Sequence, residues 1–345
     1  MRQPYWTDGP TTLYLADAGE MLAELPGASV DCLVTSPPYY GLRDYGVDGQ
    51  YGQEDSPAAY VETLRTTFRE ARRVLADDGT LWLNIGDCYA SNSDGWARGA
   101  GYNQLQPMVR PRSRQSVPPK NLLGMPWRVA FALQEDGWIL RNAIVWHKPN
   151  AMPQSVLDRV STRYEMLFLL VKQRRYWFDL DAIREPCAGD RSLSRRAHQG
   201  GNEPNSIATP WPDDGKYRDD QGSFCGKRHG TSMSATGQRH TAAHPQGRNP
   251  GDVWSISTRP LKAAHFAAFP IDIPLRAVAA GCRPHGTVCD PFAGAATTAL
   301  AARQLNRSFI GIELSEPFCE LARARILAAV ADSTSMSSES DWKVT

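Results

Sequence analysis

Short apolar runs alternate along the chain with segments that repeat apolar residues every three or four positions. Leu81 to Ile85 follows the helical pattern from Tyr60 to Leu75, and Phe309 to Leu314 precedes the helical pattern from Pro317 to Val330. Short apolar runs between helical segments are typical of buried strands in a mostly parallel sheet. The sequence therefore predicts an α/β fold in which helices cover both faces of the sheet.

This alternation stops between about Ala188 and Asn249 and again after Asp332. In the first segment Gly, Pro, Ser, Arg, Asp and His dominate without a period, which predicts an irregular insertion. The second segment is rich in Ser, which predicts a disordered tail. We expect residues 1–187 and 251–331 to be two halves of one domain, with an insertion at 188–250 and the tail at 332–345.

The apolar run Val30 to Val34 ends in the pentad Thr35-Ser36-Pro37-Pro38-Tyr39. The two prolines donate no hydrogen bonds to a sheet and force an extended turn, which leaves the Pro37 carbonyl unpaired and directed outward. This carbonyl and the Ser36 hydroxyl can each accept an N–H bond, and Tyr39 offers a flat face on which a base can stack. The pentad indicates a grip on the exocyclic amino group of a nucleobase, although a core strand that ends in prolines has the same pattern.

A second motif lies near the other end of the chain. The short apolar run Thr287 to Asp290 leads through a loop of small residues into a helical pattern from Ala299 to Leu305, which is the layout of a cofactor site at the carboxyl edge of a sheet. Glu313 ends the next apolar run, where a carboxylate can accept both hydroxyls of a ribose. The loop has neither a G-x-x-x-x-G-K-[ST] motif nor a full G-x-G-x-x-G, so a nucleoside cofactor without a pyrophosphate fits better. S-adenosyl-L-methionine is the common cofactor of that kind.

With these two motifs the chain resembles the amino-group DNA methyltransferases, which methylate N4 of cytosine or N6 of adenine. The family's [DNS]-P-P-[YFW] motif corresponds to Ser36-Pro37-Pro38-Tyr39, and its D-P-F-x-G-x-G-T-T motif begins here at Asp290. Because the catalytic motif precedes the cofactor motif, the order resembles that of the permuted β group. The resemblance covers most of the chain between Leu13 and Ile326, and it implies a Rossmann-like, S-adenosylmethionine-dependent methyltransferase sheet with an inserted target-recognition region.

The resemblance also assigns residues to the site. It implies a catalytic set of Ser36, Pro37, Pro38 and Tyr39 and a cofactor-binding set of Asp17, Thr35, Phe269, Asp290, Pro291, Phe292, Ala293, Gly294, Thr297, Thr298 and Glu313. In the family, the acid at the position of Asp17 contacts the adenine, and the segment of Phe269 lies under the methionine end. Ala296 stands where the family usually has a second glycine, and a positive φ at that position would cost about 1 kcal/mol or more.

The net charge of +1 carries no nucleic-acid signal, so the distribution of charge matters. No acidic residue occurs from Gly95 to Gln134 or from Gln221 to Gly251, and both stretches are basic. Such stretches suggest a local face that follows DNA phosphates, although two solvated loops would have the same composition. We expect contacts with double-stranded DNA from Arg110, Arg112, Arg114, Lys120, Lys227 and Arg228.

The cysteines give no sign of a metal site. None has C-x-x-C spacing, and the irregular spacing of Cys187, Cys225, His229 and His244 does not match a zinc site, so no metal is expected. The chain shows no signal peptide and no run of about 18 apolar residues, which predicts a cytoplasmic protein without a membrane partner. The sequence is compatible with a homodimer and with a cognate restriction endonuclease, and it decides neither.

The first catalytic residue bears on the choice of base. Family members with Ser-Pro-Pro-Tyr more often modify cytosine, so Ser36 favours cytosine N4 and leaves adenine N6 as the alternative. A C5-cytosine enzyme needs a nucleophilic cysteine in a Pro-Cys-Gln context, and the near match Pro186-Cys187-Ala188 does not end a strand. A catalytically silent binding protein is opposed by the intact motifs. A methyltransferase for RNA or protein is less favoured because a basic insertion is more than a small acceptor needs.

These assignments predict a separation of effects between the two motifs. Ser36→Ala and Tyr39→Ala should each lower turnover strongly while the affinity for S-adenosylmethionine stays nearly unchanged, because both residues face the acceptor. Glu313→Ala should weaken cofactor affinity first. Turnover assays and calorimetric titration of the cofactor would measure both quantities, and equal losses of affinity in all three variants would contradict the roles.

Overall fold

The computed structural model describes residues 2–90, 117–186, 247–259 and 269–338, with backbone only from residue 331 onward. The chain divides into two compact units, residues 1–183 together with 250–345, and residues 184–249. In the second unit Glu185 and Arg248 form an antiparallel bridge, with N–O distances of 3.0 and 2.8 Å. The predicted insertion at 188–250 falls within four residues of this unit's bounds. Most of it lies outside the described residues, so its role in recognition stays a prediction.

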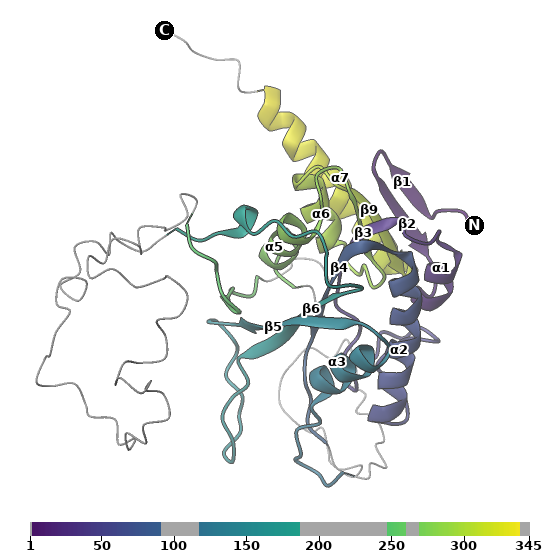
Figure 1. The fold of residues 1–345 in the computed structure, drawn as a ribbon. Coiled ribbons are helices and arrows are strands. Elements are labelled where there is room, and N and C mark those ends of the chain that lie inside the picture. The colour runs from purple at the N-terminus through teal and green to yellow at the C-terminus, as the bar shows by residue number, and fades with distance from the viewer. Residues whose placement is uncertain (1, 91–116, 187–246, 260–268, 339–345) are drawn as a thin grey trace, which may run out of the picture. The chain divides into compact units, whose positions relative to one another are not determined.

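A mixed sheet forms the centre of the first unit (Figure 1). In spatial order its described strands are β1 (Trp6–Asp8), β2 (Thr11–Leu15), β9 (Ser308–Glu313), β8 (Thr287–Asp290), β3 (Val30–Thr35), β4 (Leu75–Ile85), β6 (Tyr164–Val171), β5 (Ile139–His147) and β7 (Val253–Ser255). The five strands from β2 to β4 in this order are parallel to one another, whereas β1 is antiparallel to β2, and β6 is antiparallel to both β4 and β5. The predicted α/β class with a mostly parallel sheet is confirmed.

The strand directions bring the two sequence motifs to one edge. Leu15, Glu313, Asp290, Thr35 and Ile85 end parallel strands, so all five lie at the carboxyl edge of the sheet. From β3 the chain continues to β4, and from β8 it continues to β9 on the opposite side. The order of the strands therefore reverses between β3 and β8, and at such a switch point the connections diverge and leave a crevice for a ligand.

Helices cover both faces of the sheet, as the sequence predicts. The helices α1 (Ala18–Glu24), α2 (Pro57–Val74) and α3 (Met125–Glu135) share one apolar cluster, whereas α5 (Asp272–Gly281), α6 (Thr297–Gln304) and α7 (Glu316–Ser338) share another; the short 3-10 turn η1 spans Asp181–Ile183. Ser56 caps the start of α2, where its hydroxyl accepts from the N–H of Ala59, and Pro57 is the first residue of the helix. Both are favourable at a helix start because they satisfy or remove unpaired N–H groups.

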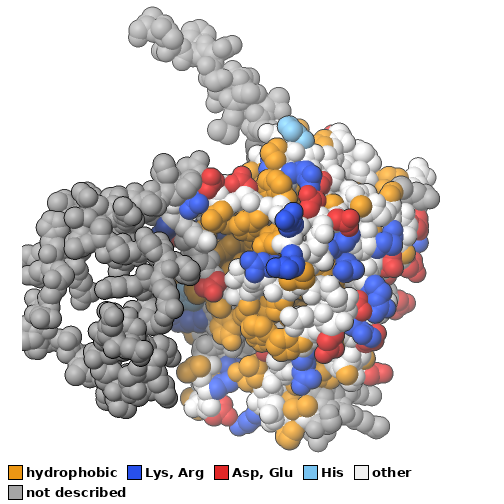
Figure 2. Space-filling model, viewed as in Figure 1, with side chains coloured by type: hydrophobic (Ala, Val, Ile, Leu, Met, Phe, Trp, Pro, Cys, Tyr) orange, Lys and Arg blue, Asp and Glu red, His pale blue; other side chains and the backbone are white. Residues whose placement is uncertain are grey.

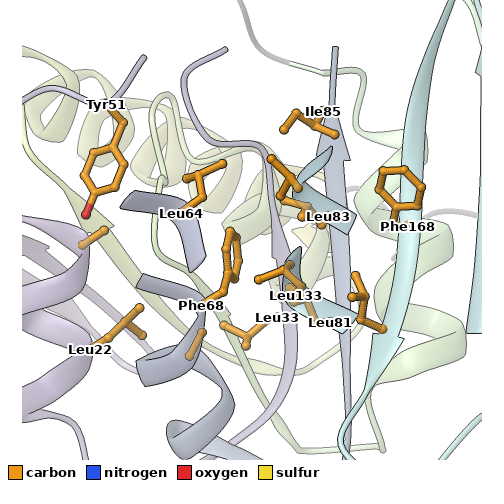
Figure 3. Close-up of a cluster of buried hydrophobic side chains, with 14 of the residues drawn as sticks. Leu22, Leu33, Tyr51, Leu64, Phe68, Leu81, Leu83, Ile85, Leu133 and Phe168 are labelled. Atoms are coloured by element: carbon orange, nitrogen blue, oxygen red, sulfur yellow. The ribbon is translucent and has the colours of Figure 1, made fainter. Parts of the chain in front are cut away.

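The strand β4 shows how the side chains divide between the two clusters. Leu81, Leu83 and Ile85 point toward α2 and α3, where Figure 3 shows them beside Phe68 and Phe168. Trp82 points to the opposite face and packs with α5. Successive side chains of a strand alternate between faces, so a strand covered on both sides is apolar at almost every position.

The C-terminal boundary differs from the prediction. A disordered tail was expected from residue 332, but α7 continues to Ser338, and only residues 339–345 lie outside the description. Extending a helix that is already formed adds one hydrogen bond for each residue fixed, so the last turns can follow the preceding Ala-rich turns without a new nucleus. Composition alone therefore placed the boundary too early.

Gly281 provides a test of the packing between α5 and β4. A Cβ on this residue would lie 2.4 Å from the Thr80 hydroxyl and closer still to the Trp82 indole nitrogen, and both side chains are buried. Helix propensity alone would make Gly281→Ala stabilising by about 1 kcal/mol, but overpacking in a core costs about 1–3 kcal/mol. We expect a net loss of unfolding free energy in urea titration. The control Gly27→Ala should be neutral or slightly stabilising, because its nearest contact would be 3.6 Å; a stabilised Gly281→Ala would contradict this packing.

Candidate active site

The carboxylate of Asp290 joins the ends of β3 and β8. Its Oδ1 accepts from the Thr35 hydroxyl at 2.6 Å and from the Phe292 N–H at 3.1 Å, and its Oδ2 accepts from the Thr298 hydroxyl at 2.7 Å. Burial raises the pKa of Asp290 from 3.8 to about 6, while the three hydrogen bonds oppose the shift. Neutral and ionised forms are therefore both accessible near neutral pH.

Glu313 lies beside this carboxylate at the end of β9. Its Oε2 accepts from the N–H of Gly294 at 2.8 Å, and its Oε1 accepts from the N–H of Ser315 at 2.8 Å. Burial raises the pKa of Glu313, and these backbone bonds oppose the shift. Each carboxylate oxygen can accept more than one hydrogen bond, so Glu313 keeps acceptor capacity for the two hydroxyls of a ribose.

A pocket opens above these carboxylates. Its empty volume, with the open mouth included, is about 1030 Å³. Aromatic side chains line much of it, and two pairs meet edge to face: Tyr51 with Phe292 at 4.9 Å between ring centroids, and Tyr45 with Phe318 at 5.9 Å. None of the described residues that line the pocket is Lys or Arg, whereas two acidic residues, Asp290 and Glu313, do line it. The pocket suits a cationic nucleoside that carries no phosphate, and S-adenosylmethionine, with its sulfonium, has that chemistry.

The pentad forms the adjoining wall of the same pocket. Ser36, Pro37, Pro38 and Tyr39 all line it. The buried Tyr60 hydroxyl donates to the Pro38 carbonyl at 2.9 Å, which holds the diproline turn in place. No described residue donates a hydrogen bond to the Pro37 carbonyl, so this oxygen and the Ser36 hydroxyl are available to an amino group.

Three residues that the sequence did not single out stand behind the pentad. The Asn84 Oδ1 lies 3.0 Å from the Tyr39 hydroxyl and 3.4 Å from the Ser36 hydroxyl, and the Tyr39 hydroxyl donates to Glu165 Oε2 at 2.6 Å. Glu165 also binds the Lys148 ammonium. The one available signal was Asn84, a polar residue inside the apolar run of β4, because buried polar side chains need partners.

The predicted cofactor residues fall into two groups. Those that line the pocket are Phe269, Asp290, Pro291, Phe292, Ala293, Gly294, Thr297 and Glu313. Thr35 and Thr298 are fully buried and hold Asp290 from behind. Asp17 does not line the pocket either, since it caps α1 by accepting from the N–H of Glu20 at 3.0 Å. Only its Oδ1 is used by this cap, and its neighbours Ala16 and Ala18 line the pocket, so a contact between Asp17 and the cofactor stays a prediction.

Further lining residues had no motif to mark them. Tyr45, Gln50 and Tyr51 come from the segment after the pentad, whereas Ser315 immediately precedes α7 and Phe318 lies in its first turn. Both segments reach the pocket because they follow strands that end at the same edge of the sheet. That proximity depends on strand order, which the sequence pattern does not specify.

Of the predicted DNA-binding residues, Lys120 alone is described. Its side chain is 83% exposed and pairs with Asp158 at 2.6 Å. Arg110, Arg112, Arg114, Lys227 and Arg228 lie outside the described residues. On the described part of the face in Figure 2, basic and acidic side chains are interspersed.

Comparisons with known proteins agree with this geometry. The model of the N6/N4 methylase family, described as DNA methylase, matches residues 30–324. The type II methyltransferase M.Cfr9I of Citrobacter freundii is 40% identical over 316 residues, which cover 91% of this chain and 87% of that protein. M.SmaI of Serratia marcescens is 39% identical over 316 residues, which cover 91% of this chain and 90% of that protein.

Solved structures share the fold. The cytosine-N4-specific PvuII DNA methyltransferase aligns with a TM-score of 0.59 at 16% identity over 93% of this chain and 88% of that chain. The putative DNA modification methylase TTHA0409 of Thermus thermophilus, in complex with S-adenosyl-L-methionine, aligns with a TM-score of 0.53 at 21% identity over 92% of this chain and 93% of that chain.

The chain thus belongs to the N6/N4 family of DNA methylases, as the two motifs predicted. It is an amino-group DNA methyltransferase. No described helix is long and apolar enough to cross a membrane.

The raised pKa of Asp290 predicts a measurable pH dependence of stability. A carboxyl whose folded pKa exceeds its unfolded value contributes stability that is complete below about pH 4 and is lost as pH rises through about 6. This loss should reach about 3 kcal/mol at pH 8. Asp290→Asn copies the neutral acid, because Thr298 can turn its proton toward the Val34 carbonyl at 3.4 Å and accept from the amide.

Urea titration of the cofactor-free protein at several pH values would compare the two forms. The unfolding free energy of Asp290→Asn relative to the original protein should increase from pH 4 to pH 8. Parallel curves for the two proteins would contradict a raised pKa at this carboxylate.

Proposed function

We propose that this protein transfers the methyl group of S-adenosyl-L-methionine to the exocyclic N4 of cytosine in double-stranded DNA. The observation that carries the proposal is the wall formed by Ser36 and Pro37, where two free acceptors face the pocket that contains Asp290 and Glu313. An amino group has two N–H bonds, and this wall offers one acceptor for each.

The residues of the wall address the main obstacle to the reaction. The lone pair of an exocyclic amine is delocalised into the ring, so the amine is a weak nucleophile while it stays planar. Hydrogen bonds to the Ser36 hydroxyl and the Pro37 carbonyl favour a tetrahedral nitrogen, on which the lone pair is localised. When bound, S-adenosylmethionine supplies an electrophilic methyl group on its sulfonium.

Tyr39 supports the orientation of the base. Its hydroxyl is held by Glu165 and Asn84, and a Cβ on Gly86 would lie 2.6 Å from its ring, so the ring packs closely against a residue without a side chain. A ring that is fixed in this way offers a prearranged surface to a flipped base.

A covalent mechanism through cysteine finds no support at this pocket. No described cysteine lines it, and burial raises the pKa of Cys289 beside Asp290, which is the opposite of what a nucleophile needs. The amine therefore attacks without a covalent enzyme intermediate.

Two considerations favour cytosine over adenine. Ser36 takes the first place of the catalytic motif, where aspartate is more usual in adenine enzymes, and the PvuII enzyme of the same fold is cytosine-N4-specific. Adenine N6 presents a similar amino group to the same two acceptors and is the second candidate. By analogy with the type II relatives, we further propose that the protein protects DNA against a cognate restriction endonuclease.

The first test is mass spectrometry of nucleosides from the DNA of a methylation-free host that expresses the protein. N4-methylcytosine should appear with the original protein and be absent with Ser36→Ala. N6-methyladenine instead would keep the mechanism and overturn the choice of base. A host DNA without either product, despite intact cofactor binding, would overturn the proposal and favour a silent binding protein.

A further inference from the structure

A chain of hydrogen bonds leads from the pocket to a carboxylate outside it. The Ser36 hydroxyl lies 3.2 Å from the Tyr39 hydroxyl, which lies 2.6 Å from Glu165 Oε2. Ser36 follows β3, and Glu165 lies at the start of β6. The hydrogen bonds therefore connect β3 and β6, the two strands that flank β4. The side chain of Glu165 is 17% exposed, and it does not line the pocket.

Asn84 fixes the direction of these hydrogen bonds. Its amide nitrogen donates to the Met166 carbonyl at 3.1 Å, which turns its Oδ1 toward Ser36 and Tyr39. Asn84 is buried and accepts through this oxygen, so it offers no proton to either hydroxyl.

The single hydroxyl proton of Tyr39 has two acceptors within reach. The Glu165 carboxylate is nearer than the Asn84 amide and carries a charge, so the proton is donated to Glu165. The Ser36 hydroxyl is then left to donate toward Tyr39 or Asn84, at 3.2 and 3.4 Å. Its lone pairs consequently face the pocket, where an amino group can donate to them.

We infer that Glu165 is the terminal proton acceptor of methyl transfer, which it serves through a relay of Ser36 and Tyr39. The inference rests on the proposed function. Once the amine nitrogen has formed its bond to the methyl group, it is cationic and must lose one proton. The N–H bond breaks as the Ser36 oxygen takes that proton, the proton of Ser36 passes to the Tyr39 oxygen, and the proton of Tyr39 passes to Glu165. The products are a neutral methylated amine and a neutral Glu165. The step consists of proton transfers alone, so nothing is oxidised or reduced.

The basicity that the relay requires is small. Lys148 binds Glu165 and lies 4.3 Å from the centre of the Trp146 ring, so the carboxylate has a cationic partner beside it. A weak base suffices because a cationic nitrogen conjugated to an aromatic ring is a strong acid. Burial and the negative charge of Glu165 raise the pKa of Tyr39, so its hydroxyl stays protonated. Tyr39 therefore accepts one proton only as it donates another.

Glu165→Gln, Tyr39→Phe and the double variant test the relay. Glu165→Gln keeps an oxygen for Tyr39 but cannot take a proton, and Tyr39→Phe keeps the ring but breaks the connection. We expect each to lower the single-turnover rate of DNA methylation by at least about 10²-fold, with the dissociation constant for S-adenosylmethionine unchanged within about twofold. The double variant should be no slower than the slower single variant, because both changes interrupt one path.

The chain offers a matched control in another trio of the same chemistry. The Tyr5 hydroxyl donates to Glu320, and Glu320 pairs with Arg323 at 2.9 Å. None of these three residues lines the pocket. Glu320→Gln should therefore leave the single-turnover rate unchanged. In Glu165→Ala, added formate should restore part of the rate because it can replace the missing base, and the same formate should not restore Tyr39→Phe.

Each outcome decides between a proton relay and a structural role. A full rate in Glu165→Gln, multiplying losses in the double variant, or a loss of cofactor affinity as large as the loss of rate would overturn the relay. An original protein that methylates no DNA would overturn the proposed function and the relay together. An active original protein with an equally active Glu165→Gln would overturn the relay alone.

Discussion

The carboxylate of Asp290 holds together two segments whose residues Thr35 and Asp290 are 255 positions apart. A buried carboxylate is costly unless donors surround it. Its three donors are Thr35 at the end of β3, Thr298 in α6 and the backbone of Phe292 in the loop between β8 and α6. Satisfying one buried group therefore sets the position of the acceptor-binding turn relative to the cofactor loop. The pocket exists because these segments cannot move apart without leaving that group unpaired.

The sequence predicted the parts of this arrangement that depend on local pattern. Apolar runs located the strands, and the prolines and small residues located the turns at their ends, because both follow from backbone chemistry within a few residues. The partners of those turns were not predictable in the same way. Asn84 and Glu165 reach Tyr39, and Lys148 reaches Glu165, through the pairing of β4, β5 and β6. By contrast, the cap that Asp17 provides for α1 is a local feature, since its partner Glu20 is three residues away.

Ala296 illustrates how a departure from a family pattern is tolerated. Its φ is 56°, in the left-handed region that the expected glycine would adopt freely. For an alanine this conformation costs about 1–2 kcal/mol. The residue is fully buried against the α5 and α6 side of the sheet, where its methyl group recovers about 0.8 kcal/mol. Burial thus offsets part of the cost, and the loop keeps a shape that presents the Gly294 N–H to Glu313.

The place of β3 in the sheet has a consequence for how the protein is made. β3 pairs with β4 on one side and with β8 on the other, but β8 begins only at Thr287. At a synthesis rate of about 5–20 residues per second, roughly 10–50 s pass between the synthesis of β3 and that of β8. During that interval the nascent chain presents an unpaired, apolar strand edge, which is prone to aggregation. The strand order that creates the pocket therefore also exposes one edge of its central strand during synthesis.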